Sequence, residues 1–243
     1  MDTHISSELV GNVWTIGINR ADQQNALTAT LFDALANALQ LAQSDVRVNS
    51  VLIHGTSTCF CAGHDVAGFG SLWPYTETGA VGRCIRAFAT QPKPLVAAVN
   101  GLAAGFGATV LLHADYIVAG EGAVFQFPYA DSGTVPEAAS TALLSRRVGD
   151  LRAREWLISG RQISADEAHS SGFISKVVAD SSALSIAKEY AHELASKPPS
   201  ALQATRRLIS DGMTRGALEA IDAELNYLVS HVPAGVWKFI PHT

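Results

Sequence analysis

The sequence predicts an α/β protein in which helices join the short strands of a parallel sheet. Residues 51–54 and residues 95–99 are apolar runs with the length and composition of buried strands. Residues 28–42 carry leucines at helical spacing, and residues 78–91 predict a second helix that lies between the two strands. Strands that alternate with helices in this way are typical of a parallel sheet with right-handed crossovers.

The other elements are predicted from local patterns. A hairpin is expected at residues 8–19, where a Gly11-Asn12 turn separates two apolar runs, and Thr28 is placed to cap the helix that follows. Ser164 and Glu167 have the spacing of a capping box. We further expect strands at 116–118, 123–127 and 173–178, helices at 136–148, 151–159 and 168–171, helices from 182 onward with a break at 197–199, and a mobile loop or lid at 68–79.

Composition narrows the class of protein. A chain of 243 residues is ample for a hydrophobic core, and its 16% of charged residues suits a protein that buries extra surface against other subunits. A formal net charge of −5 gives no electrostatic reason to expect nucleic acid as a partner. No internal repeat and no clear linker divides the sequence, so we expect one αβ core with a helical C-terminal part.

The cysteines and the apolar segments indicate the cellular compartment of the protein. Cys59, Cys61 and Cys84 are too few and wrongly spaced for a disulfide framework or a zinc site, which favours a reducing cytosol. The first residues lack the pattern of a secretory signal, and no uncharged apolar stretch reaches the roughly 20 residues that span a bilayer. We therefore expect a cytoplasmic protein without a membrane partner or a metal.

Residues 95–115 place small residues where a strand turns into a helix. Asn100-Gly101 ends the apolar run, and Gly105 and Gly107 allow a ligand to approach the backbone closely. The first N–H groups of a helix have no intrahelical partner, so such a junction stabilises a negatively charged oxygen. The same glycines also suit an ordinary strand–helix junction that needs tight packing, and this stretch alone does not decide between the two.

A second stretch, residues 60–66, also follows an apolar strand and has small residues where the backbone must turn. Two such loops can aim two amides at one oxygen, the arrangement that stabilises an enolate or a tetrahedral oxyanion. With these loops in view, residues 8–211 resemble the crotonase superfamily of enoyl-CoA hydratases and isomerases. The motifs that carry the resemblance are Asn19-Arg20 with Asn25-Ala-Leu27, Phe60-Cys-Ala-Gly-His-Asp65, Asn100-Gly101 with Gly105, and Ala114-Asp115.

The resemblance implies a fold and an assembly. The expected fold is a spiral of ββα units at residues 1–195, followed by a helical trimerisation region at residues 196–243. A homotrimer or a dimer of trimers is implied, with an acyl-CoA thioester as the partner. Residues 225–243 depart from the acidic helix and basic aromatic segment that usually end such chains. Coenzyme A contacts from that segment are therefore not carried over.

The resemblance also implies the binding residues. The oxyanion hole would consist of the backbone N–H groups of His64 and Phe106. The substrate and coenzyme A path would be lined by Arg20, Ala26, Ala62, Gly63, Asp65, Gly105 and Tyr129. Arg20 could equally be a surface charge, and Asp65 could be the N-cap of the next helix. The imidazole of His64 is either a pocket wall or an acid/base group. No cofactor is implied beyond the coenzyme A of the substrate.

The catalytic carboxylate departs from the hydratase pattern. Enoyl-CoA hydratases hold water with two glutamates, and the corresponding positions here are Thr109 and Tyr129. Glu137 instead resembles the single glutamate of peroxisomal-type 3-enoyl-CoA to 2-enoyl-CoA isomerases, which also carry a bulky residue at the position of Phe106. A plain alternative for Glu137 is a carboxylate in the first turn of the helix predicted at 136–148.

These residues predict isomerisation of 3-enoyl-CoA to 2-enoyl-CoA through Glu137. One alternative is an enoyl-CoA hydratase, or another acyl-CoA lyase or hydrolase, that uses water held by Tyr129, Asp131 or Glu137. Asp131 is the second choice as acid/base, and Asp115 is expected to have a structural role. A further alternative is a coenzyme A-binding homologue without turnover. The acyl chain length is not specified by these residues.

Overall fold

The computed structural model describes residues 4–68 and 76–231, and within these ranges the strands form two sheets. The larger has the order β1 (Ile5–Val10), β2 (Val13–Ile18), β3 (Ser50–His54), β5 (Leu95–Val99), β7 (Tyr116–Gly120) and β10 (Lys176–Val178). The smaller has the order β4 (Cys59–Cys61), β6 (Leu102–Ala104), β8 (Val124–Gln126) and β9 (Gln162–Ser164). The β1–β2 and β8–β9 pairs are antiparallel and the others are parallel.

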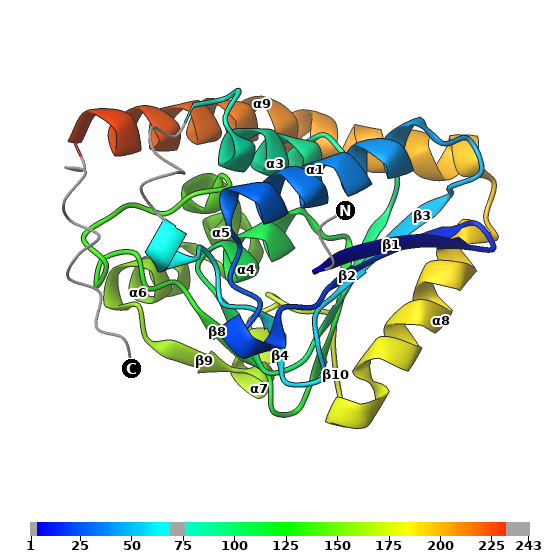
Figure 1. Ribbon diagram of the computed structural model, residues 1–243, viewed down its shortest axis with the longest axis horizontal. Helices are drawn as coiled ribbons and strands as arrows, with labels where there is room; N and C mark the ends of the chain where they lie inside the picture. The colour runs from blue at the N-terminus through cyan, green and yellow to red at the C-terminus, as the bar shows by residue number, and fades with distance from the viewer. Residues whose placement is uncertain (1–3, 69–75, 232–243) are drawn as a thin grey trace.

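The helices surround these sheets (Figure 1). They are α1 (Ala29–Ser44), α3 (Ala80–Ala89), α4 (Phe106–Thr109), α5 (Ser140–Val148), α6 (Asp150–Ser159), α7 (Ala165–Ser170), α8 (Ala183–Ala195) and α9 (Pro199–His231). Four 3-10 turns within the described residues are η1 (Ala21–Gln23), η2 (Val66–Gly68), η3 (Val110–His113) and η4 (Asp180–Ser182). The predicted αβ organisation is therefore present, with the helices in the order that the sequence predicts.

The larger sheet is covered on both faces, which explains its nearly continuous apolar strands. In β3, Val51 and Ile53 belong to the core shared with α1 and α3, whereas Leu52 packs with the alanines of α8. Figure 1 shows α1 and α3 on one side of this sheet and α8 on the other. Because side chains alternate along a strand, one short apolar run serves two cores at once.

Each spiral step pairs one strand of the larger sheet with one strand of the smaller. β3 is followed by β4, β5 by β6, and β7 by β8, before a helical connection returns the chain. The expected ββα units are thus present. The stretch at 95–115 differs from the predicted strand, turn and helix, because β6 lies between the Asn100-Gly101 turn and α4. Its three residues are too few to show a period of their own.

Several local predictions are confirmed at the level of single contacts. Val10 pairs with Val13 across the hairpin turn. The hydroxyl of Thr28 accepts the N–H of Leu31 at 3.3 Å, which caps α1, and the hydroxyl of Ser164 accepts the N–H of Glu167 at 3.2 Å. The reciprocal half of the predicted capping box is replaced, because the Glu167 carboxylate is bound by Arg161 instead.

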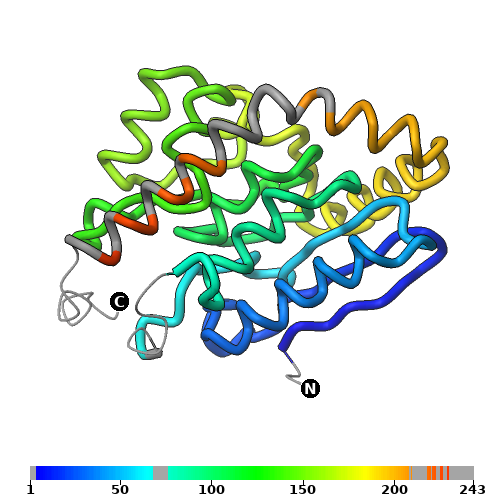
Figure 2. The backbone as a smooth tube through the Cα atoms, turned by 90° about the horizontal axis from the view of Figure 1, so that it is seen from above, coloured from blue at the N-terminus to red at the C-terminus, as the bar shows by residue number. Residues whose placement is uncertain are grey.

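The helix α9 (Pro199–His231) runs across one side of the molecule (Figures 1 and 2). Ile221 and Leu225 are buried in the main core, and Arg206 binds Asp115 at 2.7 Å and the carbonyl of Gln91. Asp115 also accepts the N–H of Leu95 at 2.7 Å, which agrees with its expected structural role. The boundary at residue 196 and trimerisation stay predictions. Residues 232–243 and most of the predicted lid, residues 69–75, lie outside the described residues.

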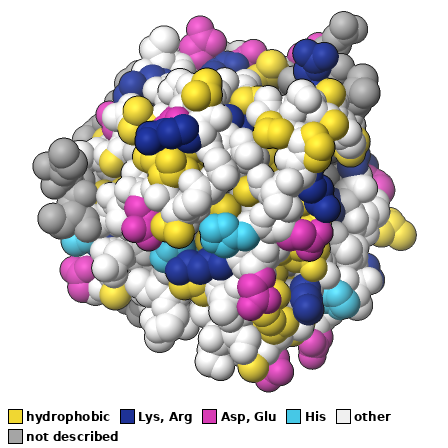
Figure 3. Space-filling model, turned by 90° about the vertical axis from the view of Figure 1, so that its right-hand side faces the viewer, with side chains coloured by type: hydrophobic (Ala, Val, Ile, Leu, Met, Phe, Trp, Pro, Cys, Tyr) yellow, Lys and Arg dark blue, Asp and Glu magenta, His cyan; other side chains and the backbone are white. Residues whose placement is uncertain are grey.

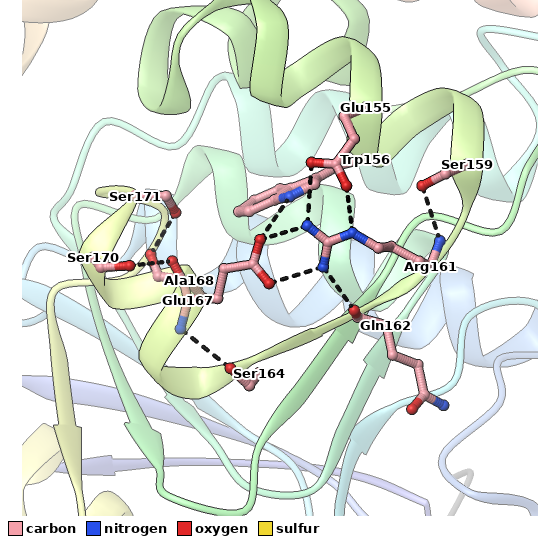
Figure 4. A network of polar contacts seen from close by, with 10 residues as sticks. All are labelled: Glu155, Trp156, Ser159, Arg161, Gln162, Ser164, Glu167, Ala168, Ser170 and Ser171. Carbon is pink, nitrogen blue, oxygen red and sulfur yellow. Dashed lines mark hydrogen bonds and ion pairs between the residues drawn. The ribbon is translucent and has the colours of Figure 1, made fainter.

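A polar network holds the far edge of the smaller sheet (Figure 4). The Arg161 guanidinium binds Glu167 at 2.5 and 2.8 Å and also pairs with Glu155, while Trp156 donates to Glu167 at 3.3 Å. Hydrogen bonds from Arg161 lower the pKa of both glutamates. The Trp156 ring is fully buried and stacks on Phe127 with centroids 6.2 Å apart. The network therefore braces the segment that leads to Tyr129.

The surface carries both charge signs. On the face in Figure 3, basic and acidic side chains lie interspersed with apolar and uncharged groups, so this face presents no field of one sign. Among the described helices, none combines the length and the hydropathy required to cross a membrane. Residues 4–68 and 76–231 contain no cluster of three or more His, Cys, Asp or Glu side chains arranged to hold a metal ion.

Gly101 has a steric role that can be measured. Its φ is +60°, and a Cβ atom there would lie 1.7 Å from the carbonyl oxygen of Thr58. Gly149 has a φ of +86° with no atom within 4 Å of such a Cβ. We expect Gly101→Ala, where strain and the clash add, to lower the free energy of unfolding by roughly 2–5 kcal/mol, and Gly149→Ala, where only backbone strain acts, by roughly 1–3 kcal/mol. Urea unfolding checks both, and equal losses would contradict the close approach.

His113 makes stability depend on pH. Desolvation by burial lowers the pKa of His113 to about 4, and the charges of Arg147 and Arg206 act in the same direction. As the pH is lowered, His113 takes up a proton near pH 6.5 in the unfolded chain but only near pH 4 in the folded chain. The contribution of His113 to the free energy of unfolding is therefore fully present above pH 6.5 and is lost as the pH falls to about 4. We expect this loss to be at most ~3 kcal/mol and to shrink in His113→Gln, as measured by urea unfolding at several pH values. An equal loss in both proteins would contradict it.

Candidate functional site

Two glycine-containing loops meet at the ends of β4 and β6. A Cβ atom on Gly63 would lie 3.0 Å from the carbonyl oxygen of Ala104 and 3.4 Å from the nitrogen of Phe106. A Cβ atom on Gly105 would lie 4.0 Å from Gly63 Cα and 4.0 Å from the hydroxyl of Tyr129. The structure therefore brings together the loops that the sequence predicts to act on one oxygen, with Tyr129 beside them.

The backbone of Phe106 begins the helix α4. Gly105 is the N-cap residue, with φ +53° and ψ −121°, and its own N–H donates to the carbonyl of Gln126 at 3.0 Å. As the first residue of the helix, Phe106 has no intrahelical acceptor for its N–H, which lies at the positive end of the helix. This position fits the predicted oxyanion donor, although four residues of α-helix give only a small dipole.

The backbone of His64 is held by a single bridge to Leu27. The N–H of Leu27 donates to Gly63 at 2.8 Å, and the N–H of Asp65 donates to Leu27 at 3.0 Å. In a parallel bridge, the residue that lies between the two bonded neighbours, here His64, directs its own N–H and C=O away from the partner strand. The His64 N–H is thus directed away from Leu27, and the bridge fixes its orientation.

Glu137 lies in this site with its carboxylate buried. Its exposed fraction is 3%, and its two oxygens lie 2.9 and 3.0 Å from Nε2 of His64. The hydroxyl of Tyr129 donates to the same carboxylate at 3.2 Å, and Thr109 lies 3.4 Å from that hydroxyl. Tyr129 and Thr109, the positions that the resemblance matches to the hydratase glutamates, are thus neutral side chains, one in contact with Glu137 and the other in contact with Tyr129.

The helix predicted at 136–148 begins later than expected. The helix α5 starts at Ser140, and Ala138 and Ala139 before it have left-handed φ values of 55° and 59°. Glu137 therefore does not lie in a first helical turn, and the plain alternative of a helix-start carboxylate is wrong. The turn is supported by the carbonyl of Ala138, which lies 3.0 Å from Nε2 of His113. Strained turns of this kind need such support from their surroundings.

Aromatic rings hold the imidazole of His64. The ring centroid of Phe32, from α1, lies 4.9 Å from that of His64, and Phe106 lies 6.3 Å away. Phe32 and Phe106 pack edge to face at 4.8 Å, and both are buried. The imidazole therefore has apolar rings behind it and the carboxylate of Glu137 in front.

The two loops of the predicted coenzyme A path are tied together by an ion pair. The Arg20 guanidinium donates to Asp65 at 2.6 Å and to the carbonyl of Ala26 at 2.9 Å. Arg20 is thus more than a surface charge. Asp65 also accepts the N–H of Ala67 at 3.0 Å, so the N-cap alternative holds at η2. The N–H groups of Ala26 and Ala62 donate to the carbonyls of Gln23 and Gln24 at 2.9 and 3.0 Å, so both donors are used within these loops.

Other candidate groups have surroundings that differ from those of Glu137. Asp131 is exposed, and a Cβ atom on Gly160 would lie 2.6 Å from its carboxylate. Burial raises the pKa of Cys61 to about 12 and raises that of Cys84 as well, and the charge of Glu137 acts in the same direction. Because the thiolate is the nucleophile, these thiols are inert at neutral pH.

Sequence reasoning missed the contact between His64 and Glu137. The two residues are 73 positions apart, and no local pattern joins them. The signal that existed was chemical, since the resemblance placed both residues around one substrate and left the role of the imidazole open. Phe32 was missed in the same way, because it reads only as one apolar residue of an amphipathic helix.

Comparisons with known proteins agree with this geometry. The enoyl-CoA hydratase/isomerase family model matches residues 8–234. The chain is 32% identical to 1,2-epoxyphenylacetyl-CoA isomerase of Escherichia coli K12, over 92% of this chain and 88% of that protein. It is 34% identical to 2,3-dehydroadipyl-CoA hydratase of the same organism, over 81% of this chain and 78% of that protein.

A solved structure shares the whole architecture. The crystal structure of an enoyl-CoA hydratase/isomerase from Pseudoalteromonas atlantica T6c has a TM-score of 0.92 and 31% identity, and the match covers 97% of this chain and 94% of that chain. The spiral of ββα units is thus the crotonase fold. By its motifs, its fold and these similarities, the chain belongs to the enoyl-CoA hydratase/isomerase family of the crotonase superfamily.

Proposed function

We propose that this enzyme converts 3-enoyl-CoA thioesters to 2-enoyl-CoA thioesters, with Glu137 as its only acid/base. The observation that carries the proposal is the carboxylate of Glu137, which is 3% exposed and contacts His64 in one of the two glycine loops that lie against each other. Membership of the family supports an acyl-CoA substrate, but its members include isomerases and hydratases, so it does not select the reaction.

The chemistry needs one base and one electrophilic site. Carbon 2 of a 3-enoyl thioester lies between a carbonyl and a double bond, so its proton becomes acidic when the thioester oxygen is stabilised. Glu137 takes this proton, and the electron pair moves into a dienolate whose oxygen is held by the N–H groups of His64 and Phe106. The same carboxyl returns the proton at carbon 4, and the double bond then lies between carbons 2 and 3.

The neighbours of Glu137 support isomerisation over hydration. A hydratase positions water with two carboxylates, whereas Thr109 and Tyr129 are neutral here. Thr109 contacts the hydroxyl of Tyr129, and that hydroxyl donates to Glu137. Tyr129 is buried, with an exposed fraction of 7%, and occupies the space beside the base. A carboxyl that must take and return a proton benefits from surroundings that exclude water, because water would compete for the proton.

Several features of the enzyme stay predictions. The substrate and coenzyme A path would run along Arg20, Ala26, Ala62, Gly63, Asp65, Gly105 and Tyr129. A homotrimer or a dimer of trimers is the expected assembly, and the cytoplasm is the expected location. The proposed reaction needs neither a metal nor a cofactor, since the coenzyme A belongs to the substrate.

Turnover of two substrates by Glu137→Gln tests the proposal. We expect the parent protein to convert 3-hexenoyl-CoA to 2-hexenoyl-CoA, and Glu137→Gln to lower kcat by roughly 100- to 10,000-fold because it removes the only base. Hydration of 2-hexenoyl-CoA is measured in parallel. Glu121→Gln, an exposed carboxylate on a turn, and Asp131→Asn serve as matched controls that keep the parent's kcat.

Each remaining outcome favours another function. Hydration of 2-hexenoyl-CoA that survives Glu137→Gln would remove this carboxylate from the mechanism and favour a hydratase or hydrolase. Loss of activity in Asp131→Asn instead would move the acid/base role to Asp131. If acyl-CoA binds tightly and neither substrate is turned over, the chain is a binding homologue without catalysis.

A further inference from the structure

We infer that the imidazole of His64 is a positioning residue that orients the carboxylate of Glu137 for proton transfer. The inference rests on the proposed function, because it assigns Glu137 the role of base. It goes beyond that function, since isomerisation as described above uses only the backbone N–H of His64. The observation behind it is that Nε2 lies within hydrogen-bond distance of both carboxylate oxygens, at 2.9 and 3.0 Å.

The protonation of the pair follows from hydrogen-bond chemistry. An ionised carboxylate can only accept, so Nε2 of His64 carries a hydrogen whenever Glu137 is ready to act as a base. The hydroxyl of Tyr129 donates to Oε1 as well, at 3.2 Å. Donors from His64 and Tyr129 hold the carboxylate in one orientation, and its exposed fraction is only 3%. Burial of the ionised form is costly without such donors.

His64 itself is fixed from both sides. Its backbone is held by the bridge to Leu27, with hydrogen bonds of 2.8 and 3.0 Å through Gly63 and Asp65. Its ring packs on Phe32, which is fully buried in α1. The imidazole therefore has little freedom to follow a carboxylate that moves, and the carboxylate has to adopt the orientation that the imidazole sets.

This arrangement joins two functions in one residue. The backbone N–H of His64 is the proposed donor to the thioester oxygen, and its side chain binds the base 73 positions along the chain. Because one rigid residue contacts both, the distance between the oxyanion site and the base is set before the substrate binds. Such preorganisation lowers the cost of reaching the transition state rather than that of binding.

Two substitutions at position 64 separate the side chain from the backbone. His64→Leu keeps the backbone N–H and the bulk but removes the donor to Glu137. We expect kcat for 3-hexenoyl-CoA to fall roughly 10- to 100-fold, while KM changes less than about threefold. His64→Gln keeps an N–H donor at similar reach, and we expect it to recover most of the lost kcat. Thermal unfolding of both variants checks that they fold.

The outcomes are decisive. Equal kcat in His64→Leu, His64→Gln and the parent, or equal losses in both variants, would overturn the inference. In a Glu137→Gln background, His64→Leu should have no further effect on kcat, because the group that it orients is gone. An additional loss there would show that the imidazole acts on another part of the site.

A spectroscopic readout is independent of turnover. In protein labelled with 15N at histidine, we expect a downfield Nε2–H proton of His64, identified by its disappearance in His64→Gln, to move upfield in Glu137→Gln. Absence of a hydrogen on Nε2 in the parent would overturn the inference. If the parent protein fails to isomerise 3-hexenoyl-CoA but shows this signal, the proposed function fails while the orientation of Glu137 by His64 stands.

Discussion

The close backbone contact between the two glycine loops is the constraint on which the site depends. A Cβ atom on Gly107 would lie 2.1 Å from the carbonyl oxygen of Cys61, and one on Gly63 would lie 3.4 Å from the nitrogen of Phe106. Side chains at these points would push the loops apart and separate the two amides that are proposed to share one oxygen. The smaller sheet supports this contact, because β4 and β6 pair directly before the loops begin.

The base is supplied by a part of the chain that neither loop contains. Glu137 reaches the site from the turn before α5, which the left-handed Ala138 and Ala139 and the contact to His113 hold in place. Its carboxylate is buried, and donors from His64 and Tyr129 offset the cost of that burial. The same contacts therefore stabilise the buried carboxylate of Glu137 and orient it.

The sequence predicted much of the fold and part of the site. Patterns of apolar residues located β3, β5, α1 and α6, and the caps at Thr28 and Ser164 proved right. Elements of three residues, such as β6, could not be found in this way, because they are too short to show a period. The start of α5 was also misplaced, since Pro136 favours a first helical turn locally, whereas the chain forms a turn with left-handed Ala138 and Ala139 before the helix begins at Ser140.

The sequence by itself determined the family, the class of fold and the residues from which the site is built, because motif order and hydrophobic period are properties of the chain alone. Only the tertiary structure decided which of those residues meet. The pairing of His64 with Glu137, the packing of Phe32 behind the imidazole and the tie between Arg20 and Asp65 all join distant segments. No local preference encodes such contacts, since they arise when the two sheets and α1 bury their apolar faces together.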